Sequence, residues 1–222
     1  GGTGFCYLDL IKLLPHDQPC YLIQDPSIDA DKILFQDIPS MASYYNSLLL
    51  NELKVTQFIL AGYSFGGMLS LEMVHQLESK KLSEAIRLVI AFDTWVISSF
   101  MNAKAKEALR LSILKQYERV EHELLKGSIN PKPWMELQYH RLQNLGFAYK
   151  PPIINKKIML FKARQQPDEF SAMNDVTNYL AAHTHQGVDV YLVPGTHNSI
   201  LQYPHVTDIG LLLSKHLKDN AF

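Results

Sequence analysis

Short, continuous apolar runs alternate along the chain with segments in which apolar residues recur every three or four positions. Runs of this length, closed by turn residues, are typical of buried strands. They lie at residues 20–24, 55–61, 86–92, 157–163 and 188–193. The helical spacing occurs at residues 5–14, 39–53, 68–77, 174–185 and 205–217, and residues 27–37 resemble a loop. Strands and helices in alternation predict an α/β fold, with a mostly parallel sheet covered by helices on both faces.

The alternation stops between residues 98 and 150, where the sequence has no strand signal and contains two helix-like segments. The first segment carries one apolar stripe. The stripe consists of Leu109, Ile113, Tyr117, Val120 and Leu124. A helical insertion at this point predicts a lid over a pocket, at about residues 98–150. The alternative is an ordinary helical layer, because most amphipathic helices only pack.

Length and composition fit a single domain. The chain has 222 residues, of which 47% are hydrophobic and 19% are charged, and 21 basic against 22 acidic residues give a formal charge of −1. This balance argues against nucleic acid or an anionic membrane as partner, and no apolar run is long enough to span a membrane. Two cysteines, Cys6 and Cys20, are too few for a disulfide scaffold, which favours a reducing, cytoplasmic compartment. The opening Gly1-Gly2-Thr3-Gly4 resembles a loop that follows a strand, so we expect a domain taken from a longer polypeptide.

The strongest motif follows the strand predicted at residues 55–61. It reads Gly62-Tyr63-Ser64-Phe65-Gly66-Gly67 and leads directly into a predicted helix. A serine between a buried strand and a helix, flanked by glycines, is typical of a nucleophile elbow. We expect Gly62 and Gly66 to prevent collisions across the tight turn, and Gly67 to let the helix approach the sheet. The N–H of Phe65 would then point at a developing oxyanion.

A serine nucleophile requires a base, and the base requires an orienting acid, in the chain order serine, acid, histidine. His197 directly follows the last predicted strand and would meet Ser64 at the carboxyl edge of the sheet. The acid is open between two candidates on pattern alone. Asp93 ends the strand after the elbow helix, and Asp168 lies shortly after the next strand.

Four motifs together resemble the thioesterase domains of nonribosomal peptide, polyketide and fatty acid synthases. They are Gly-Gly-Thr-Gly-Phe-x-Tyr at residues 1–7, the elbow at 62–67, an aspartate that closes the following strand, and Val-Pro-Gly-Thr-His-Asn-Ser-Ile-Leu at 193–201. The resemblance implies an α/β-hydrolase fold with a helical lid, and it places the acid at Asp93. It also implies a second oxyanion donor at Gly1 or just before it. Thr196 stands where the family often has an acidic residue, a departure that affects local loop hydrogen bonds more than the triad.

The resemblance implies a serine thioesterase that releases an acyl or peptidyl chain from the phosphopantetheine arm of a carrier domain. Ser64 would form an acyl-enzyme, His197 would transfer the proton, and Asp93 would orient the imidazole. No metal or dissociable cofactor is expected, and the partners would be a carrier domain and a small-molecule acyl substrate. The alternatives are a stand-alone editing thioesterase, a small-molecule esterase on the same fold, or a non-catalytic binding module that retains the elbow as scaffold.

Overall fold

Four parallel strands form one sheet in the order β1-β2-β3-β4. The strands are β1 (Phe58–Tyr63), β2 (Ile86–Phe92), β3 (Ile158–Gln165) and β4 (Val188–Thr196). The computed structural model describes residues 4–30, 34–54, 56–98, 107, 111, 145–166 and 175–219. Each of these strands was predicted from its apolar run, although β1 begins later than expected and β3 and β4 extend further. Parallel neighbours require a crossover between successive strands, and the sequence provides a long connection each time.

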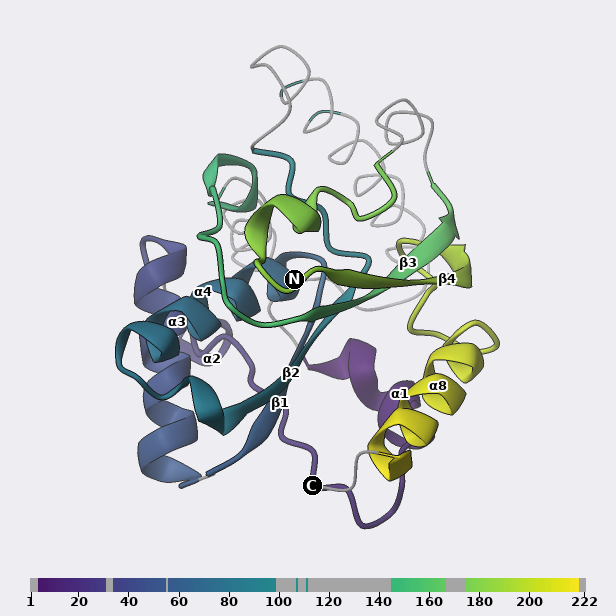
Figure 1. Ribbon diagram of the computed structural model, residues 1–222, viewed down its shortest axis with the longest axis horizontal. Helices are drawn as coiled ribbons and strands as arrows, with labels where there is room; N and C mark the ends of the chain where they lie inside the picture. The colour runs from purple at the N-terminus through teal and green to yellow at the C-terminus, as the bar shows by residue number, and fades with distance from the viewer. Residues whose placement is uncertain are drawn as a thin grey trace.

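Helices cover both faces of this sheet (Figure 1). One face carries α3 (Ile38–Ser47) and α4 (Phe65–Ser79), and the other carries α1 (Leu8–Ile11) and α8 (Val206–Asp219). The three-layer α/β architecture predicted from the sequence is therefore confirmed. No helix within the described ranges has both the length and the apolar character needed to cross a membrane.

Two separate hydrophobic clusters fill the space between the sheet and its helices. Val89 and Ala91 of β2 belong to the cluster under α3 and α4, whereas Ile90 and Phe92 belong to the cluster under α1 and α8. Alternate residues of a strand point to opposite faces, so a strand covered on both sides must be apolar throughout. This double burial is why the strands appear in the sequence as unbroken apolar runs.

The helix α3 begins where the sequence supplies a cap. The Asp37 carboxylate accepts a hydrogen bond from the Ser40 N–H at 2.7 Å, and Pro39 occupies the first turn. An aspartate N-cap satisfies an N–H that has no acceptor within the helix, and proline is favoured in the first turn. The helix continues as a π-helical turn, η2 (Leu48–Glu52), so the helix predicted at residues 39–53 is confirmed.

The strand predicted at residues 20–24 is wrong. The residues there form no strand, and Cys20, Tyr21 and Leu22 are exposed. A strand requires neighbouring backbone groups for its hydrogen bonds. In the described part of the chain no strand pairs with this segment, and β1 pairs only with β2. The two cysteines are free thiols and are exposed.

The N-terminal third differs from expectation in two smaller ways. The helix expected at residues 5–14 is a 3₁₀ turn, η1 (Phe5–Tyr7), followed by α1, and it ends well before Pro15. The loop expected at residues 27–37 contains a short helix, α2 (Ser27–Ala30). The buried carboxylate of Asp25 accepts the N–H of Ser27 at 2.9 Å, which caps the start of that helix.

The helix predicted at residues 174–185 is also wrong. Its described residues form a turn followed by a 3₁₀ helix, η4 (Leu180–His183). Asp175 Oδ1 accepts the N–H groups of Thr177 and Tyr179, both at 2.8 Å, and such side-chain bonds compete with helical ones. Asn178 and Tyr179 have φ of 53° and 64°, in the left-handed region that interrupts a right-handed helix.

The predicted lid, at about residues 98–150, lies almost entirely outside the described residues. Residues 145–148, at its C-terminal end, are helical.

Candidate active site

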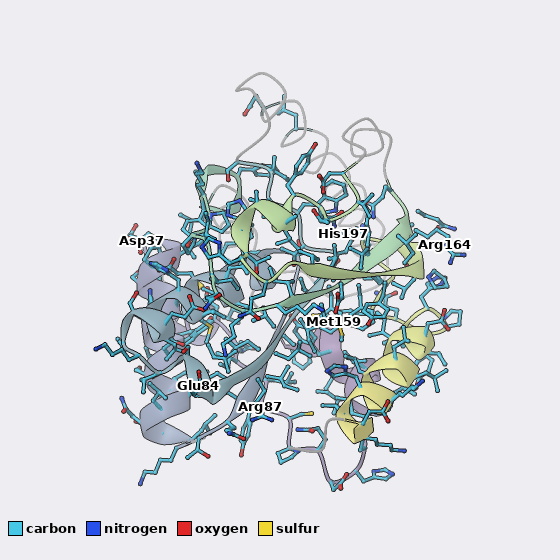
Figure 2. All side chains as sticks on the ribbon, viewed as in Figure 1. Asp37, Glu84, Arg87, Met159, Arg164 and His197 are labelled. Atoms are coloured by element: carbon cyan, nitrogen blue, oxygen red, sulfur yellow. The ribbon has the colours of Figure 1, made fainter. Side chains whose placement is uncertain are left out.

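Each of the four strands is followed directly by a polar residue. Ser64 follows β1, Asp93 follows β2, Gln166 follows β3 and His197 follows β4. Parallel strands end at the same edge of a sheet, so these four residues gather there. Figure 2 shows His197 and Arg164, near the ends of β4 and β3, far from Arg87 at the beginning of β2 and from Glu84 just before it.

Ser64 occupies the strained turn predicted for it. Its backbone has φ 53° and ψ −116°, a conformation that residues other than glycine rarely adopt. Its N–H donates to the Phe92 carbonyl at 3.0 Å, and its own carbonyl accepts from the Thr94 hydroxyl at 3.1 Å. Both bonds join the elbow to the end of β2, and together they hold the strained turn in place.

The glycines around Ser64 do different things. A Cβ on Gly62 would lie 2.2 Å from the backbone of Gly66, and a Cβ on Gly67 would lie 1.9 Å from Thr94 Oγ1. These short distances confirm that a side chain at position 62 would collide across the turn, and that Gly67 lets α4 lie close to the end of β2. For Gly66 no such collision is found, because among the described residues an added Cβ there would meet only the Tyr7 hydroxyl, at 3.4 Å.

The structure brings together the serine, histidine and aspartate singled out from the sequence. His197 Nε2 lies 3.1 Å from Ser64 Oγ, and His197 Nδ1 lies 2.8 Å from Asp93 Oδ2. The Asp93 side chain is fully buried, whereas that of His197 is 31% exposed. With the Nδ1 proton donated to the carboxylate, Nε2 is free to accept the serine proton. Asp168, the alternative acid, lies outside the described residues.

Asp93 is held in place by its backbone and by its second oxygen. Its φ is 42°, and its N–H donates to the Phe161 carbonyl at 2.8 Å. Oδ1 accepts the Ala163 N–H at 3.0 Å and the Gln166 side-chain amide at 3.1 Å. A buried carboxylate needs such donors, because it has no water to replace them.

Tyr63, the residue before the nucleophile, supports His197. Its hydroxyl donates to the His197 carbonyl at 2.6 Å, and its ring stacks on the imidazole with centroids 4.9 Å apart. The loop itself is closed by the Thr196 N–H, which donates to Ser199 Oγ at 2.9 Å, and by the Ser199 N–H, which donates to the Thr196 carbonyl at 3.1 Å. Thr196 thus takes part in the hydrogen bonds of the loop, as its departure from the family pattern suggested.

Tyr7 is a residue of the site region that the sequence reasoning did not single out for a role. Its hydroxyl oxygen accepts the Tyr63 N–H at 2.8 Å, one residue before the nucleophile. Burial raises the pKa of Tyr7, so the phenol stays neutral. Gln166 was missed as well. The available signals were its position directly after a strand and, for Tyr7, its place in the N-terminal glycine motif.

Of the two predicted oxyanion donors, Phe65 and Gly1, only Phe65 is among the described residues. Phe65 is the first residue of α4, and the first N–H groups of a helix have no acceptor within it. Its ring packs against Gly146, where an added Cβ would lie 3.2 Å from Phe65 Cδ2. Gly1 lies outside the described residues, so its part in an oxyanion hole stays a prediction.

Four aromatic residues, Phe65, Trp95, Phe100 and Trp134, are the sequence candidates for an apolar surface that binds an acyl chain. Trp95 is 6% exposed and packs edge-on against Tyr179, so it belongs to the interior. Phe100 and Trp134 lie outside the described residues. Among the described residues no cluster of three or more His, Cys, Asp or Glu side chains has the arrangement of a metal site.

A parallel sheet with helices on both faces, an elbow serine after one strand and a histidine after the last defines the class of α/β-hydrolases. The sequence matches the family described as "Thioesterase domain" over residues 1–211. The chain belongs to this thioesterase family, whose members are hydrolases acting on thioesters.

Similar proteins and structures agree with this family. The chain is 25% identical over 178 residues to malpinin synthetase of Mortierella alpina. The matched region covers 78% of this chain and 2% of the synthetase. The NocB thioesterase domain, solved as a covalent complex with a fluorophosphonate nocardicin G analogue, has a TM-score of 0.69 and 21% identity, covering 97% of this chain and 90% of that one. The RedJ thioesterase of the prodiginine pathway in Streptomyces coelicolor has a TM-score of 0.72 and 16% identity, covering 97% and 86%. The two structures show a shared fold.

Proposed function

We propose that this chain releases an acyl or peptidyl chain from the phosphopantetheine thioester of a carrier domain, through an acyl-enzyme on Ser64. The observation that carries the proposal is the hydrogen-bonded series from Asp93 through His197 to Ser64 at the nucleophile elbow. A serine hydroxyl becomes a nucleophile only when a base accepts its proton, and this series provides the base and its orienting acid.

The chemistry follows from the two distances around His197. Ser64 Oγ attacks the thioester carbonyl while its proton moves to His197 Nε2, 3.1 Å away. The imidazolium then gives this proton to the leaving thiol, and Asp93 stabilises the charge through Nδ1–H at 2.8 Å. In the second half, His197 removes a proton from water or from a nucleophile of the substrate. That nucleophile attacks the carbonyl carbon of the acyl-serine, the bond from this carbon to Ser64 Oγ breaks, and His197 returns the proton to the serine oxygen, which frees the chain.

The N–H of Phe65 is our proposed first donor to the oxyanion, and Gly1 or the residue before it is the second. Preorganised backbone donors are worth most where water is excluded, and losing one costs about 10²–10³ in kcat. No metal or dissociable cofactor takes part in this scheme. The pantetheine belongs to the substrate.

The carrier domain is the proposed partner, supported by the synthetase relatives. The chain spans 2% of malpinin synthetase, a protein of many times its length. A release domain in such a polypeptide would receive its substrate on a tethered carrier. We also propose a reducing, cytoplasmic location, which is compatible with the exposed free thiols of Cys6 and Cys20.

The test is intact-mass measurement after brief incubation with a series of acyl-pantetheine thioesters. Wild type should gain the mass of the acyl group, and Ser64→Ala should gain none. Ser79→Ala, which changes an exposed serine at the other end of the same helix, is the matched control and should acylate like wild type. The absence of both adduct and released thiol in wild type would refute the proposal.

Three measurements distinguish a carrier-dependent thioesterase from a small-molecule esterase and from a binding module. A small-molecule esterase would turn over the matched oxoester, in which oxygen replaces the thioester sulfur, at least as fast as the thioester. A domain that receives its substrate from a carrier should show a higher kcat/KM for acyl-carrier protein than for acyl-pantetheine. A non-catalytic binding module would fail to react with a fluorophosphonate at Ser64.

The acid assignment has its own test. Asp93→Asn keeps the shape of the side chain but removes its charge, and we expect kcat to fall by about 10⁴. Asp168→Asn should leave turnover unchanged. The reverse result would move the acid to Asp168.

A further inference from the structure

Gln166 occupies the same position relative to its strand as the three proposed catalytic residues. Ser64, Asp93 and His197 each come directly after a strand, and Gln166 comes directly after β3, which lies between the strands that precede Asp93 and His197. Its side chain is partly buried. The topology therefore delivers a fourth polar side chain to the same edge, beside the carboxylate.

The contacts fix which end of the Gln166 amide faces Asp93. Its Nε2 donates to Asp93 Oδ1 at 3.1 Å and to the Ala163 carbonyl at 2.6 Å. Both partners are acceptors that carry no proton, so only the NH₂ end of the amide can face them. The donor and acceptor types therefore determine the orientation of the amide. Gln166 connects the Asp93 carboxylate to the main chain of β3 through these two hydrogen bonds.

Among the described residues, Gln166 is the closest side-chain donor to Asp93 Oδ1. The Ala163 N–H donates from the backbone at 3.0 Å, and Asn178 Nδ2 lies at 3.5 Å, the limit of a hydrogen bond. Lys162 interacts electrostatically with Asp93, but its ammonium donates to the Asp175 carbonyl at 2.5 Å. The donors to Oδ1 in the described part of the chain are therefore neutral, and Oδ2 contacts the imidazole of His197.

Asp93 needs this support because its own backbone is strained. Its φ of 42° lies in the left-handed region, which a residue other than glycine keeps only where its surroundings hold it. A fully buried aspartate at the end of a strand can rotate about its side-chain bonds unless both oxygens are held. Oδ2 contacts His197, so the orientation depends on what holds Oδ1.

We propose that Gln166 is a positioning residue of this site. Its amide holds Asp93 Oδ1 so that Oδ2 faces His197 Nδ1, and it acts on Ser64 only through the aspartate and the histidine. This inference rests on the proposed function of the Ser64, His197 and Asp93 series, and it adds a residue that touches neither the substrate nor the reacting atoms.

The test compares Gln166→Met, which keeps the length of the side chain but removes its donor, with Gln165→Met. Gln165 is the preceding residue and is exposed, so its variant is the matched control. Gln166→Met should lower kcat for an acyl-pantetheine thioester by about 10-fold with KM unchanged, because a hydrogen bond to a charged group is lost. Gln166→Glu places a second carboxylate against Asp93 and should lower kcat further. Gln165→Met should behave like wild type.

Two readouts separate positioning from general damage. The far-downfield proton NMR signal of His197 Nδ1–H reports the contact with Asp93 without any substrate, and it should shift or broaden in Gln166→Met only. In an Asp93→Ala background, Gln166→Met should cause no further loss in the rate of fluorophosphonate labelling. If Gln166→Met does not fold, Gln166→Ala carries the same expectations.

An unchanged kcat and an unchanged His197 proton signal in Gln166→Met would overturn the proposal. So would an equal loss in the Asp93→Ala background, since Gln166 would then act elsewhere. A wild type that reacts with fluorophosphonate but cleaves no thioester would count against the proposed function alone. The labelling rates and the proton signal would still decide the role of Gln166.

Discussion

At the scale of single residues, the nucleophile and the acid share an unusual backbone. Ser64 and Asp93 have φ of 53° and 42°. Tyr63 and Phe92 are partners across β1 and β2, and Ser64 and Asp93 are the residues that directly follow them. A residue other than glycine in such a conformation costs about 1–3 kcal/mol and persists only where its surroundings hold it. Here the main chain holds both, through the Ser64 N–H to Phe92 and the Asp93 N–H to Phe161.

The glycines on either side of Ser64 give a prediction at this scale. Gly62→Ala should destabilise the protein by more than about 3 kcal/mol or prevent folding, because the new Cβ would meet the Gly66 backbone, which cannot move aside. Gly66→Ala should change the free energy of unfolding by less than about 1 kcal/mol, since alanine is favoured within a helix. Urea unfolding measures both. Similar losses in the two variants would contradict this reading of the elbow.

The identity of the acid shows what sequence pattern lacks at this scale. Asp93 and Asp168 both follow strands, so their spacing from Ser64 and His197 left them equal, and only the resemblance favoured Asp93. The donors to Asp93 Oδ1 come from the end of β3, about 70 residues further along the chain. No local pattern marks a glutamine or a backbone N–H as a partner over that separation.

At the scale of elements, α3 depends on its cap. The hydrogen bond from the Ser40 N–H lowers the pKa of Asp37 below its ordinary value. A carboxyl with a lowered pKa in the folded state contributes stability that is fully present above its unfolded pKa. This contribution is lost as the pH falls through the lowered value.

Asp37→Ala should therefore lower the free energy of unfolding by about 1 kcal/mol near neutral pH. The difference from wild type should shrink as the pH falls below the ordinary range of an aspartate carboxyl and through the lowered pKa of Asp37. Asp37→Asn keeps a capping oxygen without a titrating group and is the control. Urea unfolding of the three proteins across this range measures both effects, and a loss in Asp37→Ala that is independent of pH would contradict the argument.

The elements that were predicted wrongly have specific causes. Residues 20–24 have the apolar composition of a strand, but strand formation depends on a neighbour that composition does not reveal. Residues 174–185 have helical spacing in part, but the Asp175 side chain captures backbone N–H groups that a helix would use. The doubly buried strands were predicted well, because an unbroken apolar run is a local signal.

At the scale of the whole molecule, one partly buried hydrogen bond joins α4 to the C-terminal end of the segment predicted as the lid. The Tyr149 hydroxyl donates to Glu72 Oε2, and Glu72, on α4, is 7% exposed. The Gln76 amide donates to its other oxygen at 2.9 Å. Burial, and then the hydrogen bond and charge of Glu72, raise the pKa of Tyr149, so the phenol remains a donor.

Tyr149→Phe should lower the free energy of unfolding by about 1–3 kcal/mol, because the buried carboxylate loses a donor. Tyr21→Phe, at a tyrosine that is 56% exposed, should have no effect. Adding Glu72→Met to Tyr149→Phe should recover most of the loss, since an apolar pair leaves no unsatisfied group. Chemical unfolding of the four proteins tests this, and a double variant no more stable than Tyr149→Phe would contradict it.

The sequence by itself determined the layered α/β architecture, the positions of the strands that the structure contains, and the turn around Ser64. These features depend on periodicity, on unbroken apolar runs and on glycine, all of which act within a few residues. The tertiary structure alone decided which residues contact Asp93, which hydroxyl supports Tyr63, and why residues 20–24 form no strand. Those outcomes depend on hydrogen bonds between segments far apart in the chain, and such partners exist only once the sheet has assembled.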